Sequence, residues 1–157
     1  MLISSCHKQR GVSMIELVMF IVIISIALAG ILLVMNTVTG RSADTLIRKQ
    51  ALSIAESLLE EVELQDFTKP VGGFAGPFTP ANRASFDCVT DYNGFTTTGI
   101  YSLTNAAIPG LGSYNANVVV AGSVLGAIAA ASSVYITVTV TDPQNNQVQV
   151  SGYRTAY

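Results

Sequence analysis

An uninterrupted apolar run near the N-terminus restricts the fold of this chain more than any other feature. From Leu17 to Met35 the sequence holds 19 residues, LVMFIVIISIALAGILLVM, without a charge. A helix rises about 1.5 Å per residue, so this run can cross a hydrocarbon core of roughly 30 Å. The 157 residues include no second run of this length, and 50% of them are hydrophobic. The sequence therefore predicts one membrane-spanning helix and one small domain.

The residues just before this run decide how the helix is used. Glu16 lies where the span begins, and a carboxylate there is costly unless it lies at the headgroup level or is neutralised. The spacing alone fits either a functional glutamate or one that simply ends the span. A secretory signal is cut after its apolar core, whereas here the small residue Gly11 precedes the core and follows Lys8 and Arg10. Cleavage at Gly11 would remove a short polar leader and leave the helix on the mature protein.

A second helical pattern follows the apolar run, in RSADTLIRKQALSIAESLLEEVELQDF. Its apolar residues recur every three or four positions, which predicts an amphipathic helix with one face to bury. Those residues are Ile47, Ala51, Ile54, Ala55, Leu58, Leu59 and Val62. If Gly40 interrupts the helix, Ser42 or Asp44 would cap a fresh start.

Acidic side chains crowd the end of this second helical pattern. They are Glu56, Glu60, Glu61, Glu63 and Asp66, with no lysine or arginine among them. Because negative charge opposes the dipole at a helix C-terminus, we expect these side chains to form a solvated face. A contact with a basic partner subunit is the alternative.

The remainder of the chain is typical of a β-rich domain. Prolines and glycines in KPVGGFAGPFTP end the helix. The sequence then predicts strands at 100–104, 116–121 and 134–141. Apolar and polar residues alternate in the last of these, which returns through DPQNN into QVQVSGY as a hairpin. Its inward side chains would be Val134, Ile136, Val138 and Val140, opposite Val148 and Val150. The segment 121–133 is small and apolar, and either a short helix or a loop against the sheet fits it.

We find no set of residues typical of an enzyme. The one histidine, His7, lies in the leader, so no histidine remains to activate Cys88. The flanking Phe86 and Val89 favour burial of Cys88 over an intermolecular bridge. We therefore expect no catalytic activity and no cofactor.

Metal and nucleic-acid binding are likewise not expected. Asp87, Asp91 and Asn93 offer the oxygen ligands that calcium prefers, but their spacing matches no calcium loop and turn chemistry explains them. The net charge is -2, and no basic patch forms the electrostatic footprint of a nucleic-acid-binding protein.

Residues 10–16, RGVSMIE, followed by the apolar helix, resemble the prepilin signature of type IV pilins and type II secretion pseudopilins. The resemblance implies that prepilin peptidase cuts after Gly11 and that the new terminal amine, on Val12, is methylated. The family usually has phenylalanine in place of Val12. Glu16 corresponds to the glutamate at the fifth mature position, whose carboxylate can meet the amine of Val12 on a neighbouring subunit. Such a pair is strong in a low dielectric and would set the axial register of a filament.

The same resemblance implies the overall organisation. It predicts an α+β, type IV pilin-like fold, in which a long N-terminal helix packs on a small antiparallel sheet. The expected parts are a leader (1–11), a transmembrane and filament-core helix (12–40), an amphipathic helix half (41–66) and a globular β-rich domain (67–157). Pilins of this family often have a proline in the membrane half of the helix, whereas this chain has only Gly30 there.

Two later segments narrow the resemblance. ADTLIRKQALSIAESLLEEVELQDF and RASFDCVTDYNGF are similar to minor pilins of the mannose-sensitive haemagglutinin (MSHA) pilus, which typically have aspartate in place of Cys88 and Thr90. The implied role is a minor pilin that helps to start or complete a pilus for surface attachment. A type II secretion pseudopilin and a non-polymerising, membrane-tethered binding domain are the alternatives.

The implied partners and location follow from that role. The partners are major and minor pilin subunits, prepilin peptidase and the inner-membrane assembly machinery. The chain would lie in the bacterial inner membrane before assembly, and in a periplasmic or cell-surface pilus afterwards.

Overall fold

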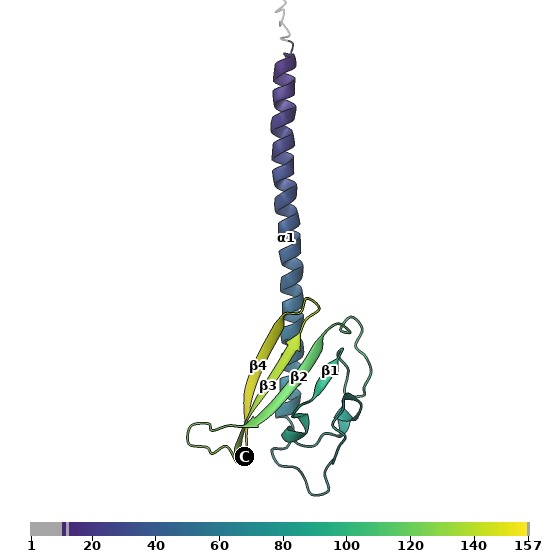
Figure 1. Ribbon diagram of the computed structural model, residues 1–157, viewed down its shortest axis with the longest axis vertical. Coiled ribbons are helices and arrows are strands. Elements are labelled where there is room, and N and C mark those ends of the chain that lie inside the picture. The colour runs from purple at the N-terminus through teal and green to yellow at the C-terminus, as the bar shows by residue number, and fades with distance from the viewer. Residues whose placement is uncertain (1–10, 12, 157) are drawn as a thin grey trace, which may run out of the picture. The chain divides into compact units, whose positions relative to one another are not determined.

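The computed structural model describes residue 11 and residues 13–156, without the side chains of residues 41–43. Its elements in chain order are α1 (Met14–Glu63), the 3-10 helices η1 (Pro80–Ser85) and η2 (Val89–Tyr92), and the strands β1 (Thr96–Thr98), β2 (Asn115–Gly122), β3 (Ser133–Thr141) and β4 (Gln147–Thr155) (Figure 1). The chain divides into two compact units, Met1–Ala43 and Asp44–Tyr157.

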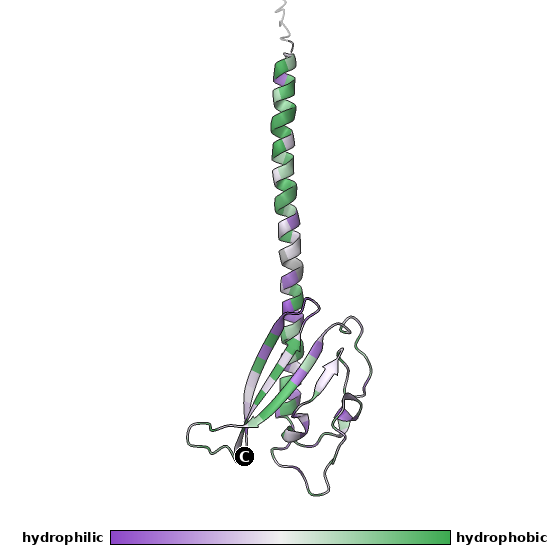
Figure 2. Cartoon of the chain, viewed as in Figure 1, coloured by the Kyte–Doolittle hydropathy of each residue, from purple (hydrophilic) through white to green (hydrophobic). Residues whose placement is uncertain are grey.

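The first unit is the apolar part of α1, which is green in Figure 2. Its large apolar side chains between Leu17 and Met35 are exposed, from 40% at Ile24 to 70% at Leu33. The Ser25 hydroxyl is satisfied within the helix, since it donates to the Ile21 carbonyl at 2.7 Å. By length and composition, α1 contains a stretch that can cross a membrane.

Helix α1 continues without interruption through Gly40, so no second helix begins after that glycine. Asp44 does not act as a cap; its Oδ1 accepts a hydrogen bond from Gln144 Nε2 at 2.7 Å. The helix ends at Glu63, slightly before the expected boundary. A glycine in mid-helix costs about 1 kcal/mol relative to alanine, and this cost is too small to break a long helix.

The second unit is built on an antiparallel sheet with the strand order β1-β2-β3-β4. Val138 on β3 lies opposite Val118 on β2 and Val150 on β4, so the valines of three strands share one face. This face packs on the part of α1 that begins at Asp44. The residues of the two surfaces that are fully buried are Ala51, Ala55, Val62, Val118, Ile136, Val138 and Val140. The predicted amphipathic face and C-terminal hairpin are therefore confirmed.

The prediction of a strand at 100–104 is wrong. Tyr101 makes only an isolated bridge to Ala107, and the edge strand is instead β1, a run of three threonines. Gly94 and Gly99 flank β1 with φ angles of 79° and 84°, a conformation that favours glycine and ends a strand. The apolar residues after Gly99 pack as a loop because the chain turns away from β2 at that glycine.

The undecided segment between β2 and β3 is a loop. Residues 123–132 contain no helix; Leu125 and Ile128 pair by two backbone hydrogen bonds, of 3.1 and 2.9 Å. Gly126, at the tip, has a φ of 57°. Most of the loop is exposed, so it does not lie against the sheet.

A long N-terminal helix thus packs against a small antiparallel sheet of four strands. This is the predicted α+β arrangement, and it is consistent with a type IV pilin-like fold.

Candidate functional site

The first candidate site is the start of α1, where the predicted processing residues lie. Gly11 is exposed, and nothing lies within 4 Å of a Cβ built on it, so the backbone there is accessible. Val12 and residues 1–10 fall outside the described residues. Ser13 precedes the helix, and its carbonyl accepts the first helical hydrogen bond, from Leu17 N at 3.1 Å.

Glu16 lies in the first turn of α1 and is exposed. A negative charge is favourable at this end of a helix because the N-terminal N–H groups give it a partial positive charge. Ser13 and Glu16 also have the spacing of a capping box, a local pattern that our sequence reasoning missed. Among residues 11 and 13–156, no cation pairs with Glu16. Its carboxylate is therefore accessible to a charge outside the described part of the chain.

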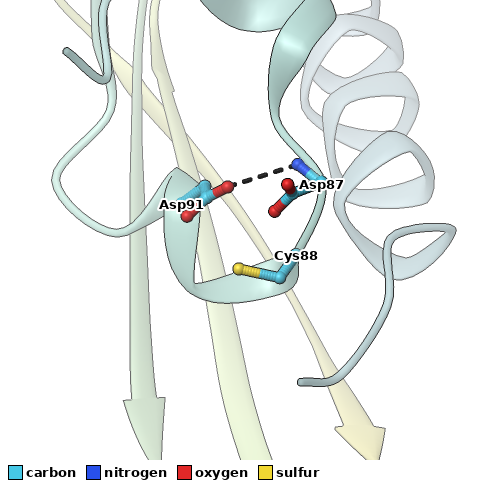
Figure 3. Close-up of side chains that lie close together, drawn as sticks. All are labelled: Asp87, Cys88 and Asp91. Atoms are coloured by element: carbon cyan, nitrogen blue, oxygen red, sulfur yellow. Dashed lines mark hydrogen bonds between the residues drawn. The ribbon is translucent and has the colours of Figure 1, made fainter. Parts of the chain in front are cut away.

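The second candidate site is a cluster of Asp87, Cys88 and Asp91 around the start of η2 (Figure 3). One ligand-type atom from each residue lies within 4.8 Å of the others. The Asp87 N–H donates to Asp91 Oδ2 at 3.2 Å, and Cys88 Sγ lies 3.1 Å from Thr90 Oγ1. Asn93, the third residue of the calcium set considered above, is used elsewhere: its Oδ1 accepts from Val120 N at 3.1 Å.

Lys69 already provides the positive charge for this cluster. Its Nζ lies 2.7 Å from Asp91 Oδ1 and 4.9 Å from the centre of the Phe78 ring. Burial alone would raise the pKa of Asp91, but the hydrogen bonds from Lys69 and from the Asp87 backbone hold it below its usual value. Asp87 Oδ2 accepts from Phe74 N at 2.5 Å. The two carboxylates thus fasten the loop between α1 and η2, and a metal ion would have to displace Lys69.

Cys88 is fully buried in this cluster, as its flanking residues suggested. Burial raises the pKa of its thiol. Since the thiolate is the nucleophilic form, the thiol is a poor nucleophile at neutral pH. The arrangement suits packing rather than covalent chemistry.

A third polar cluster corrects the expectation of a solvated acidic face at one position, Glu61, whereas Glu56 and Glu60 are exposed as expected. Glu61 is mostly buried and pairs with Arg83 through both carboxylate oxygens. Tyr92 donates its hydroxyl hydrogen to Glu61 Oε1 at 2.7 Å, and Arg83 Nη1 donates to the Tyr101 carbonyl at 3.0 Å. Burial opposes the charge on Arg83, but the bonds to Glu61 raise its pKa. This network joins α1 to η1, η2 and the loop after β1.

Comparison with known proteins bears on the first of these sites. The family model described as Prokaryotic N-terminal methylation motif matches residues 6–32. The chain has a type IV prepilin-like N-terminus. Such a motif implies processing by prepilin peptidase and assembly with other pilins, and it supports a pilin-like or pseudopilin-like protein. Neither the comparison with curated proteins nor the one with solved structures found a match.

The prepilin-like motif and the apolar helix are together consistent with anchoring in the inner membrane before assembly. Proteins with this motif are typically structural subunits rather than enzymes. The site most relevant to function is therefore the start of α1, whereas the two polar clusters of the second unit stabilise its loops.

Proposed function

We propose that this chain is a minor pilin, a structural subunit that helps to initiate or complete an MSHA-like type IV pilus used for surface attachment. The observation that carries the proposal is the prepilin-like methylation motif at residues 6–32, directly joined to an exposed apolar helix. The resemblance of residues 43–67 and 83–95 to MSHA minor pilins supports a role like that of the minor pilin MshD.

In this proposal, the chain is inserted with residues 1–11 as its leader. Prepilin peptidase removes the leader after Gly11, and Val12 becomes a methylated terminal amine. Residues 12–40 then form the part of the helix that moves from lipid into the filament core. Residues 41–66 and 67–157 form the amphipathic helix half and the globular domain of the subunit.

Glu16 would set the register at that step. Its carboxylate is exposed at the start of α1, where it can meet the Val12 amine of a neighbouring subunit. Two charges at about 4 Å attract several times more strongly near a protein than in bulk water. The pair also removes the cost of leaving either charge alone in lipid. A neighbour in the wrong axial position would leave both charges unpaired, so correct register is favoured.

The apolar surface of α1 explains why such a subunit must either remain in lipid or assemble. Its large side chains from Leu17 to Met35 are at least 40% exposed, and an apolar surface of this extent requires a membrane or other subunits to cover it. The proposal thus places the chain in the inner membrane before assembly and in a periplasmic or surface pilus afterwards.

Two experiments test this proposal. The first is intact mass and N-terminal sequencing of the protein from its native membrane, where we expect a start at methylated Val12. Met1 in assembled material would refute processing at Gly11. The second is deletion of the gene, which should reduce surface pili while the major pilin still accumulates in the inner membrane. Normal piliation and attachment would refute an assembly role.

The alternatives give different outcomes in the same experiments. A type II secretion pseudopilin would be processed at Gly11, but its deletion would block protein secretion and leave pili intact. A non-polymerising, membrane-tethered domain would gain nothing from a new amine near Glu16. It would keep its leader and would be missing from sheared filaments.

A further inference from the structure

Strand β4 forms an open edge of the sheet, since the strand order is β1-β2-β3-β4 and, within the described residues, β4 pairs with β3 alone (Figure 1). It is nine residues long, whereas β1 at the opposite edge has three. Natural proteins often protect long edge strands with lysine, proline or a bulge. Strand β4 contains neither lysine nor proline, and it pairs with β3 in an unbroken register. Its edge is therefore free to pair with a further strand.

Alternate residues of β4 direct their backbone N–H and C=O groups away from β3. The bond that continues the β3–β4 ladder, from Ala156 N to the Ser132 carbonyl at 3.1 Å, falls on an even-numbered residue of the C-terminal segment. Because ladder bonds in an antiparallel pair recur at every second residue, the backbone groups of Gln149, Ser151 and Tyr153 point to the open edge. These groups have no hydrogen-bond partner in the part of the chain that the structure describes.

A partly buried carboxylate without a cation lies beside this edge. Glu63, at the end of α1, lies over Gly152 of β4, where its Oε1 occupies the space that a side chain at position 152 would fill. Among the described residues, Glu63 has no hydrogen bond and no salt bridge. Arg154, on the same face of β4, instead places its Nη1 3.4 Å from the Thr155 carbonyl. Since a partly desolvated charge is costly when it is unpaired, Glu63 favours a cation from another molecule.

The rest of the surface beside the edge is apolar. Val148 and Val150 on β4 are partly buried against the core. Leu59 lies next to β4 at Gly152, and Leu52, two helical turns earlier on the same face of α1, is 39% exposed. A strand added to β4 would lie about 4.8 Å from it. Its inward side chains would therefore cover Leu52 and the two valines, and one of them would lie beside the unpaired carboxylate.

We propose that the open edge of β4 binds an extended strand of a different subunit, which places an apolar side chain beside Val150 and a lysine or arginine beside Gly152. The main chain of that strand bonds to the free N–H and C=O groups of β4, and its cation pairs with Glu63. A second copy of β4 does not offer this pattern, because its one cation, Arg154, follows a glycine rather than an apolar residue on the inward face.

This inference rests on the proposed role as a filament subunit and adds the chemistry of one partner contact. The sequence left open whether the acidic end of α1 contacts a basic partner subunit. The structure narrows that question to Glu63, which is the acidic residue placed against the open edge. One contact with a different protein also suits a minor subunit, which does not repeat along a filament.

Peptide binding to the full chain in detergent micelles tests this proposal. The probe is a fluorescent peptide of nine residues, the length of β4, in which valine and threonine alternate and lysine replaces the central valine. Matched peptides carry norleucine or glutamate at that position. Fluorescence anisotropy should show saturable binding of the lysine peptide, about tenfold tighter than binding of the glutamate peptide. Amide hydrogen exchange should slow at Gln149, Ser151 and Tyr153 when the lysine peptide is bound.

Two variants and a modified peptide separate main-chain pairing from the charge contact. Ser151→Pro removes an edge-facing N–H but no bond to β3, so it should weaken binding about tenfold; Ser151→Ala, which keeps the N–H, is the matched control. Glu63→Gln should remove the preference for lysine over norleucine. A lysine peptide methylated at every backbone nitrogen leaves the protein unchanged and should not bind.

The proposal is overturned if the lysine peptide shows no saturable binding, if the glutamate peptide binds equally well, or if the fully methylated peptide binds. It is also overturned if Ser151→Pro binds the lysine peptide as tightly as Ser151→Ala does, or if Glu63→Gln keeps the preference for lysine. A dimer of the unliganded chain that Ser151→Pro dissociates would show that the edge pairs with a second copy instead. Because this test needs neither processing nor a pilus, its failure would leave the tests of the proposed function unaffected.

Discussion

Removing Arg83 should destabilise the second unit more than most single substitutions. Arg83 is 11% exposed and Glu61 16%, and the guanidinium pairs with both oxygens of the carboxylate. Arg83→Met keeps most of the side-chain volume but leaves Glu61 mostly buried without its cation. Breaking a fully buried pair costs about 3–5 kcal/mol, and the residual exposure places our expectation at about 3 kcal/mol. For a domain of this size that corresponds to a fall in Tm of roughly 12 °C.

Thermal unfolding followed by near-UV circular dichroism measures this effect. The six tyrosines all lie in the second unit, so their signal reports on that unit and not on the apolar part of α1. The matched control is the double variant Glu61→Gln/Arg83→Met. Its glutamine still accepts the hydrogen bond from Tyr92 but buries no unpaired charge. We expect the double variant to recover about 2 kcal/mol relative to Arg83→Met.

Two results would contradict this reasoning. A loss below about 1 kcal/mol for Arg83→Met would mean that the pair behaves as a solvated surface pair. A double variant no more stable than Arg83→Met would mean that Arg83 acts through packing or its bond to the Tyr101 carbonyl rather than by neutralising Glu61.

Three further predictions concern other charged or reactive groups. Glu16→Ala should insert into the membrane normally but be reduced in sheared filaments; incorporation at the wild-type level would exclude the pairing with a neighbour's amine. Burial alone would raise the pKa of Asp91, but the hydrogen bonds from Lys69 and the Asp87 backbone hold it below its usual value. The contribution of Asp91 to stability is therefore present above its unfolded-state pKa and is lost as the pH falls through its lower folded-state pKa. Melting between about pH 3 and pH 7 should therefore show a shallower acid limb for Asp91→Asn than for wild type, and parallel curves would refute this. In the processed chain, Cys88 should react with a membrane-impermeant maleimide only after unfolding. As a control, Val71→Cys should react at once, because Val71 is fully exposed. Rapid labelling of Cys88 in the folded protein would contradict its burial.

Much of the fold is readable from the sequence because burial is periodic in regular elements. The alternation from Val134 to Val140 predicted which face of β3 is buried, and all four inward residues are at most 9% exposed. The spacing of Ala51, Ala55 and Val62 predicted the buried face of α1 in the same way. Where no period exists the prediction failed, as in the loop after Gly99.

The candidate sites also differ in whether their residues can be recognised from the sequence. Gly11 and Glu16 are recognisable from sequence because the motif is contiguous and acts through its position relative to the apolar run. The partners of Glu61 and Asp91 are not, since Arg83 and Lys69 are each 22 residues away in the chain and no local pattern specifies the pairing.

The sequence by itself thus determined the long apolar helix, the buried faces and the prepilin-like start, because each depends on the order of residues along one segment. Only the tertiary structure decided that Glu61 is mostly buried, that the ammonium of Lys69 pairs with Asp91, and that residues 123–132 form an exposed loop. Each of these depends on which distant segments the folded chain brings together. Whether these side chains are buried, and which groups they pair with, depends on residues outside their own segments.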